Sequence, residues 1–191
     1  MIETATVVDD DFVDRYSKVR PPSPDLREEF EDVRTDLILQ EDAEIPGEQA
    51  AALAAASHFW VEIRYVVPNR GRHEEGNQID LQKGSRVFFG FGDMRLSRNS
   101  PIGSIHILYS AHSGIRNLRF GNNSMDKLDL PIPGLEGPPS YRDQTLLFTR
   151  KSARSYRLTV GTRTEVAGWR SRSRAAGTLY QMRGGRAFGV F

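Results

Sequence analysis

The loop between residues 69 and 77 carries side chains that can read the edges of DNA bases. It holds two asparagines, two arginines, a histidine and two glycines. Arginine offers a planar fork that suits guanine or a phosphate, and asparagine can bond adenine through both amide atoms. For this stretch alone, a solvated hairpin loop is an equal alternative.

The flanking residues predict two strands that hold this loop. His58–Val67 is aromatic and β-branched, which suits a half-buried strand. Pro68 lacks an N–H group, so the strand should end there. Gln78–Leu81 then alternates polar and apolar residues, as a returning strand would.

A second stretch, residues 148–160, has the same organisation. One strand ends near its start, and Ser155–Val160 returns as another. The loop between them carries four polar or basic side chains: Arg150, Lys151, Ser152 and Arg154. Two basic loops on one small barrel could grip a DNA duplex from both sides. Phosphate contacts would then set affinity and salt dependence, and base contacts would set sequence preference.

Nuclease motifs are absent from the sequence. A phospholipase D-type nuclease needs His-x-Lys, which none of the four histidines begins. A Mg²⁺-dependent PD-(D/E)xK nuclease needs an acid two residues before a lysine. Asp80 and Lys83 have the wrong spacing, and Asp126 adjoins Lys127, so we expect surface charges at both places. The sequence also lacks a P-loop, a Rossmann motif and Gly-x-Ser-x-Gly, and it predicts no catalytic centre.

The histidines give little support for a metal site. The chain has no cysteine, and His106 and His112 have no acidic residue near them in sequence. Zinc needs three or four ligands at closer spacing. We therefore expect no metal or cofactor, and we expect His106 to be a partly buried residue that forms hydrogen bonds.

Composition indicates one substantial core and no disulfide. The chain has 191 residues, of which 38% are hydrophobic, and it contains no cysteine. No apolar run approaches the roughly 20 residues that a membrane-spanning helix needs. The N-terminus is acidic, where a signal peptide would be basic and then apolar. These features predict a soluble cytoplasmic protein.

The net charge of +1 conceals a strong asymmetry along the chain. Residues 1–50 hold 15 acidic and 5 basic side chains, a net of −10, whereas residues 51–191 hold 10 acidic and 21 basic, a net of +11. Of those 21 basic residues 18 are arginines, which favours bidentate phosphate or base contacts, although a GC-rich genome would give the same bias. The asymmetry indicates an acidic tail beside a basic binding domain.

The remaining pattern predicts a mainly β fold with two short N-terminal helices. The helices are expected from Ser23 to about Gln40 and over Glu48–Ser57. Further strands are expected over Gly84–Phe91, Ile102–Tyr109, Tyr141–Thr149 and Gln181–Phe191, with loops at 92–101, 113–123 and 130–139. We assign residues 1–57 to an acidic helical linker or extension and residues 58–191 to a barrel-like domain.

Both basic loops lie in segments that resemble the DNA-binding arms of B3-type domains. VVPNRGRHEEGNQIDL resembles their first arm, and SARSYRLTVGTRTEVAGW resembles their second, with a Ser-Tyr-x-Leu-Thr strand and a following tryptophan, Trp169. Together with SMDKLDLP and the final GRAFGVF, they are similar to the C-terminal recognition domains of restriction endonucleases of the BfiI and NgoFVII type. The resemblance covers about residues 58–191, and the order of the motifs carries it.

The resemblance implies a seven-stranded pseudobarrel that places two arms in the major groove. We call residues 69–77 the first arm and residues 150–154 the second arm. The implied DNA contacts are Asn69, Arg70, Arg72, Asn77 and Gln78 on or beside the first arm, and Arg150, Lys151, Ser152 and Arg154 on the second. The nuclease of such an enzyme would lie elsewhere on the polypeptide or on a partner subunit.

Further candidate contacts are Arg95 and Arg98 in the 92–101 loop and Arg172 in the run 169–174. A solvated turn is an equal alternative for that run, and Trp169 is expected in the core. The resulting hypothesis is sequence-specific recognition of double-stranded DNA by a non-catalytic domain.

Two rival hypotheses belong to other classes. The basic barrel could be a protein-interaction module that docks an acidic segment or subunit. A single-strand or RNA binder would need exposed aromatic residues among the basic ones, and both arms lack them apart from Tyr156. The acidic residues 1–50 could also lie over the basic surface as a DNA mimic.

Overall fold

A computed structural model describes residues 45–67, 76–92, 96–182 and 185–191. These residues form a mainly β fold with helices α3 (Gly47–Ala55) and α4 (Arg163–Ala175) and a single 3₁₀ turn, η1 (Ser85–Val87). The strands are β1 (His58–Glu62), β2 (Gln78–Leu81), β3 (Pro101–Tyr109), β4 (His112–Phe120), β5 (Asp126–Asp129), β6 (Thr145–Ser152), β7 (Ser155–Val160), β8 (Leu179–Gln181) and β9 (Ala187–Val190).

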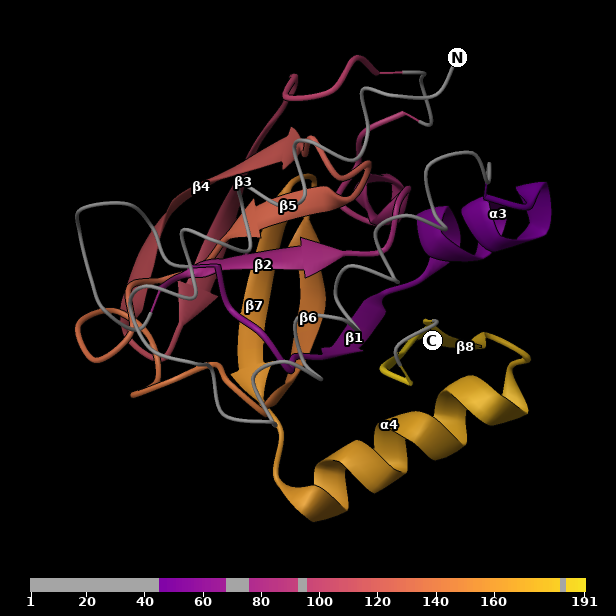
Figure 1. Cartoon of the computed structure of the whole chain (residues 1–191). Coiled ribbons are helices and arrows are strands. Elements are labelled where there is room, and N and C mark those ends of the chain that lie inside the picture. Colours follow the sequence, from indigo (N-terminus) through magenta and orange to yellow (C-terminus); the bar gives the residue numbers. More distant parts are fainter. Residues whose placement is uncertain (1–44, 68–75, 93–95, 183–184) are drawn as a thin grey trace, which may run out of the picture.

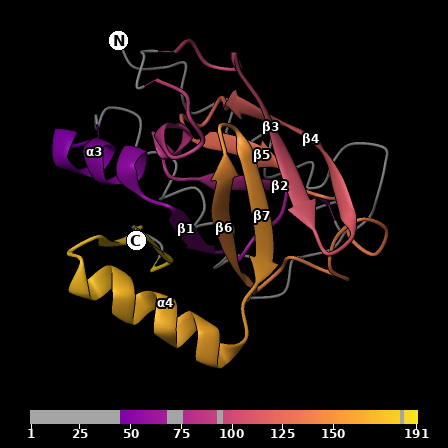
Figure 2. The same cartoon turned by 180° about the vertical axis from the view of Figure 1, so that it is seen from behind.

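The strands form one curled, open sheet that resembles half of a barrel. Their order is β2-β5-β4-β3-β7-β6-β1-β9-β8, so the sheet has nine strands where seven were predicted. All neighbours are antiparallel except β3 and β7, which are parallel. Because the sheet curls, β2 and β5 cross in front of β6 and β7 in Figure 1 and behind them in Figure 2.

The inside of this curl holds the main core. In β1, Phe59 and Val61 point inward and are fully buried, as strand alternation requires. The ring of Phe59 lies 5.3 Å from that of Phe88 and 6.2 Å from that of Phe148. These large aromatic side chains give the small domain much of its apolar burial.

Helix α4 covers the outer face of the sheet beside β1 and β9 (Figure 1). Thr162 and Glu165 form a capping box at its start. Trp169 is buried against Trp60, whose indole N–H donates to Ser173 Oγ at 2.8 Å. The prediction of Trp169 in the core is confirmed. The solvated turn considered for residues 169–174 is wrong, because these residues belong to a capped helix.

Residues 84–91 form a turn and not the predicted strand. Gly84 has φ +85°, and a side chain there would collide with Ile45, whose Cδ1 lies 1.3 Å from the Cβ position. The 3₁₀ turn that follows sends both Phe88 and Phe89 into the core. The aromatic residues of this segment were predicted as a strand because a strand and a 3₁₀ turn can both bury large side chains.

Asp126 and Lys127 are buried, so the prediction of surface charges there is wrong. Asp126 accepts from the Arg86 backbone N–H and guanidinium, each at 2.9 Å, which ties η1 to β5. Burial raises the pKa of Asp126 above its usual range, although Arg86 acts in the opposite direction. His106 also differs from its prediction, because its side chain is exposed on β3.

Several predicted elements are confirmed, and others have different bounds. The helix expected over Glu48–Ser57 is α3, and β2 and β7 have the predicted bounds. Strand β4 was missed, since its Gly/Asn-rich sequence suggested a loop. The first predicted helix lies outside the described residues. Among the helices that the structure describes, none is long and apolar enough to cross a membrane.

Candidate nucleic-acid interface

The second arm is a tight hairpin between β6 and β7. Ser152 pairs with Ser155, so Ala153 and Arg154 form the turn, and Arg154 has the left-handed φ of 57°. The register shifts between Arg150 and Ser152, which leaves Lys151 as an extra residue in a bulge. Bulges redirect side chains. Lys151, Ser152 and Arg154 are all exposed at this tip.

Arg150, in contrast, connects the second arm to neighbouring parts of the domain. Its guanidinium donates to the carbonyl of Ala54 in α3 at 3.0 Å and to that of Phe88 at 2.7 Å. It also lies 5.0 Å above the Phe88 ring. Tyr156 Oη donates to the same Phe88 carbonyl at 3.0 Å. Arg150 therefore holds the hairpin to its support and does not present its donors to a ligand in this arrangement.

The 90–92 segment lies against the tip of the second arm. The Arg154 guanidinium carbon is 4.5 Å from the centre of the Phe91 ring. The Arg86 Nε–H donates to the Gly92 carbonyl at 3.4 Å, so the buried Arg86–Asp126 pair also holds this segment. Arg98, a little further along, is exposed. The structure thus brings the second arm and the start of the 92–101 loop together, while Arg95 lies outside the described residues.

Only the base of the first arm is described, because Asn69, Arg70 and Arg72 lie outside the described residues. The base is closed by an isolated bridge in which the Val67 N–H donates to the Gln78 carbonyl at 2.8 Å. Asn77 is buried and donates to the Leu130 carbonyl at 2.8 Å. The predicted contact at Asn77 is therefore part of the support of this loop.

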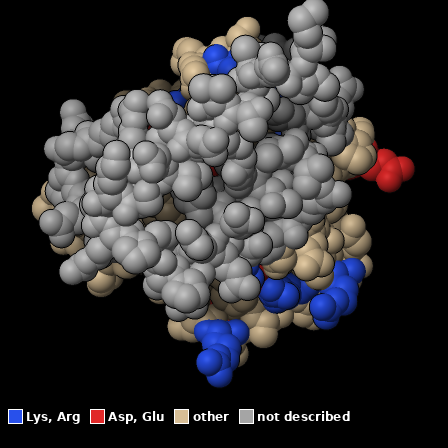
Figure 3. All heavy atoms as spheres, in the orientation of Figure 1, with Lys and Arg blue, Asp and Glu red and all other residues tan. Residues whose placement is uncertain are grey.

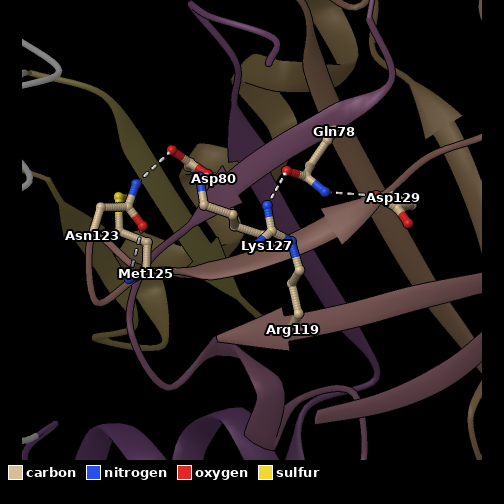
Figure 4. Close-up of polar contacts among 7 residues, drawn as sticks. All are labelled: Gln78, Asp80, Arg119, Asn123, Met125, Lys127 and Asp129. Carbon is tan, nitrogen blue, oxygen red and sulfur yellow. Dashed lines mark hydrogen bonds and ion pairs between the residues drawn. The ribbon is translucent and has the colours of Figure 1, made fainter. Parts of the chain in front are cut away.

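Gln78 also serves a structural role, within a polar network on β2, β4 and β5 (Figure 4). Its side chain donates to Asp129 at 2.8 Å and accepts from Arg119 at 3.0 Å. Beside it, Lys127 Nζ lies 2.5 Å from Asp80, which also accepts from Asn123. Asp80 and Lys127 form an ion pair, whereas Asp129 and Arg119 both bond the uncharged Gln78 side chain. No group of three possible metal-ligating side chains occurs in the described part of the chain.

The second arm and the residues that lead to the first arm lie at opposite ends of β1. Strands β1 and β6 are antiparallel, with His58 opposite Thr149 and Glu62 opposite Thr145. The second arm follows the end of β6, beside the start of β1, whereas residue 63 follows the other end of β1. Residues 63–67 then carry the chain to the base of the first arm.

Two predicted contacts, Lys151 and Arg172, lie near His58 in a basic cluster beside the second arm, and this grouping was not predicted from the sequence. His58 Nδ1 is 2.7 Å from Ser57 Oγ, and the imidazole stacks on Phe191 with ring centres 4.7 Å apart. The Arg172 guanidinium lies 5.3 Å from the same Phe191 ring. Burial, followed by the charges of Arg172 and Lys151, lowers the pKa of His58, although the Phe191 backbone acts in the opposite direction.

The charge balance leaves the arm and α4 positive. Four acidic residues of the sheet and the adjoining loop are in ion pairs: Glu62 with Arg170, Asp80 with Lys127, Asp126 with Arg86, and Glu136 with Arg116. Other basic residues form no ion pair within the described ranges: Lys151, Arg154, Arg157, Arg163, Arg172 and Arg174. Figure 3 shows basic side chains over α4.

Comparison with known proteins identifies no family for this chain, since no family model matches it and no curated protein matches it either.

Proposed function

We propose that the chain is a sequence-specific recognition domain for double-stranded DNA, with the second arm as its reading element. The observation that carries this proposal is the hairpin tip: Lys151, Ser152 and Arg154 are exposed on a turn that Arg150 braces. The major groove admits a two-stranded β-ribbon. A lysine or arginine can bond guanine or phosphate there, and serine can bond several bases.

The brace matters because base reading depends on geometry. A bidentate contact holds only if the donor fork is placed within a fraction of an ångström, so a site on a supported strand end is more selective than one on a loose loop. Arg150 and Tyr156 both bond the Phe88 carbonyl, which fixes the hairpin to η1. The support is therefore independent of the exposed donors, and the tip can bind without rearrangement of the core.

The assignment to a B3-like fold and to a restriction endonuclease rests on the resemblance of the sequence to those domains. We propose that the half-barrel is a B3-like pseudobarrel and that it serves a restriction endonuclease whose nuclease lies elsewhere on the polypeptide or on a partner subunit. The succession of hairpin, Ser-Tyr-x-Leu-Thr strand and tryptophan-bearing helix supports this assignment. Within it, the first arm supplies a second set of base and phosphate contacts.

A binding selection tests the proposal. The chain is incubated with a randomised duplex library at about 0.1 M salt, where phosphate contacts are partly screened, and the retained DNA is sequenced. A short enriched motif is expected. Retention without a motif would restrict the function to phosphate binding, and no retention would favour the protein-interaction module.

A further inference from the structure

We infer that Ser57, His58, Lys151 and Arg172 form a phosphate-binding site that extends the DNA contact from the second arm to α4. The inference rests on the proposed function, because the expected ligand is a backbone phosphate of the bound duplex. Four segments far apart in sequence meet there: the start of β1, the end of β6, α4 and the residue after β9.

The geometry of the site follows from the strand pairing around His58. The Arg150 N–H donates to the Ser57 carbonyl at 2.8 Å, which places Lys151 next to Ser57. On the other side, the His58 N–H donates to the Phe191 carbonyl at 2.9 Å. The Phe191 ring then contacts both the His58 imidazole and the Arg172 guanidinium. The Ser57 hydroxyl and the His58 imidazole are thus in contact, and the charges of Lys151 and Arg172 are near enough to affect the pKa of His58.

The charged side chains that affect His58 are both cationic, which favours an anion. Lys151 and Arg172 are exposed and form no ion pair within the described residues. The charged neighbours that affect His58 are these two cations, and no acidic side chain of the described chain is among them. Phosphate oxygens accept hydrogen bonds from all four side-chain types. The cluster thus provides polar and positively charged hydrogen-bond donors for an anion. It lies beside the hairpin tip that we propose binds bases.

Binding at this site is expected to take up a proton. Burial and the two nearby cations hold the pKa of His58 below its usual range, so the free imidazole is neutral at neutral pH. A bound phosphate offsets the repulsion from Lys151 and Arg172 and favours the imidazolium. By linkage, the pKa of His58 rises on binding, and affinity increases as pH falls from 8 to about 6.

The first test uses sulfate, whose charge is constant in this pH range. The pKa of each histidine is measured by NMR in sodium sulfate and in sodium chloride of equal ionic strength. Sulfate should raise the pKa of His58 by about 0.5 to 1 unit relative to chloride. His112, which is exposed at the start of β4, serves as the internal control in the same spectra. Equal shifts for both histidines would overturn the inference.

Two variants assign the effect to the cluster. Arg172→Ala removes a cation from the exposed side of a capped helix, so the fold should persist and the sulfate-induced shift of His58 should shrink. Arg163→Ala removes a cation at the start of the same helix and should leave the shift intact. Equal shifts in both variants would contradict the assignment of Arg172.

A duplex experiment then separates this inference from the proposed function. Affinity for the selected duplex is measured at pH 6 and pH 8 for the wild type and His58→Gln. The variant should lose the part of the pH dependence that His58 supplies. A sulfate shift without duplex binding would leave the anion site standing and reject the proposed function. Duplex binding without a sulfate shift, and with the same pH dependence in His58→Gln, would reject the anion site and leave the proposed function standing.

Discussion

Arg150 and Arg154 lie four residues apart on one hairpin, yet their environments differ completely. The guanidinium of Arg150 is occupied by the carbonyls of Ala54 and Phe88. Arg154 has a left-handed backbone conformation in the turn, is exposed, and places its guanidinium over the Phe91 ring. The first residue therefore contributes to folding stability, and the second is available for a ligand.

This division predicts opposite effects of two matched substitutions. Arg150→Ala should lower the free energy of unfolding by roughly 2 kcal/mol, because it removes two charge-assisted hydrogen bonds and leaves the Phe88 carbonyl with only its bond from Tyr156. Arg154→Ala should change it by less than about 0.5 kcal/mol, as expected for an exposed side chain. Urea unfolding of both variants measures the difference. Similar losses of stability would contradict the separation of roles.

The sequence identified the second arm but could not separate these roles. Both arginines were predicted as contacts, since their side-chain chemistry is the same. The difference has two causes. The bulge at Lys151 changes which side chains of the strand point outward, and Phe88 lies in a turn that was predicted as a strand. The grouping of Lys151 and Arg172 around His58 was not predicted, because the residues of this cluster lie up to 134 positions apart in the chain, between Ser57 and Phe191.

At the scale of elements, α4 is fixed to the sheet by a close approach at β9. A Cβ atom at Gly189 would lie 2.6 Å from Ser173 Oγ and 2.9 Å from Trp60 Nε1. These atoms form the hydrogen bond that links α4 to β1. Only glycine leaves room for this bond, so the position of α4, and with it that of Arg172, depends on Gly189.

Two glycine-to-alanine substitutions test this packing. Gly189→Ala should lower the unfolding temperature, because the added methyl group separates Trp60 from Ser173. Gly168→Ala lies at an exposed position of α4 with no atom within 4 Å of the new Cβ. It should stabilise the fold by roughly 0.5 to 1 kcal/mol through helix propensity. Thermal unfolding of both variants measures the difference, and a neutral Gly189→Ala would contradict the close packing.

Element prediction succeeded where one face of a strand is regularly apolar and failed elsewhere. Ser155–Val160 alternates clearly, and its predicted bounds match β7. Strand β4 buries Leu118 and Phe120, and its other residues are at least partly exposed, which gives a weak pattern. Helix α4 buries just Trp169 and Ser173. Its start was nevertheless readable, since Thr162 and Glu165 have the spacing of a capping box.

At the scale of the whole molecule, the acidic N-terminal segment and the basic domain carry opposite charge. Residues 1–50 hold a net charge of −10 and residues 51–191 a net of +11. Helix α3 begins at Gly47 and buries Leu53 in the main core, so a truncation must leave it intact. Removal of residues 1–44 therefore tests the acidic segment and leaves every described residue in place.

We expect the truncated chain to associate with DNA faster. If the acidic segment covers the basic surface, it competes with phosphate, and its removal should raise kon about tenfold at low salt and less at high salt. Stopped-flow association at two salt concentrations measures this. Asp9, Asp10 and Asp11 changed together to asparagine provide a full-length control that should show part of the effect. An unchanged kon at low salt would exclude competition by this segment.

The most direct test of sequence reading by the second arm compares enriched motifs. The randomised-duplex selection is repeated with Arg154→Ala and with Arg163→Ala as the matched exposed control. We predict that Arg154→Ala loses preference at one or two base pairs and costs about 1–3 kcal/mol on the wild-type motif. Arg163→Ala should keep the motif. An unchanged motif and affinity in Arg154→Ala would contradict base reading by this arm.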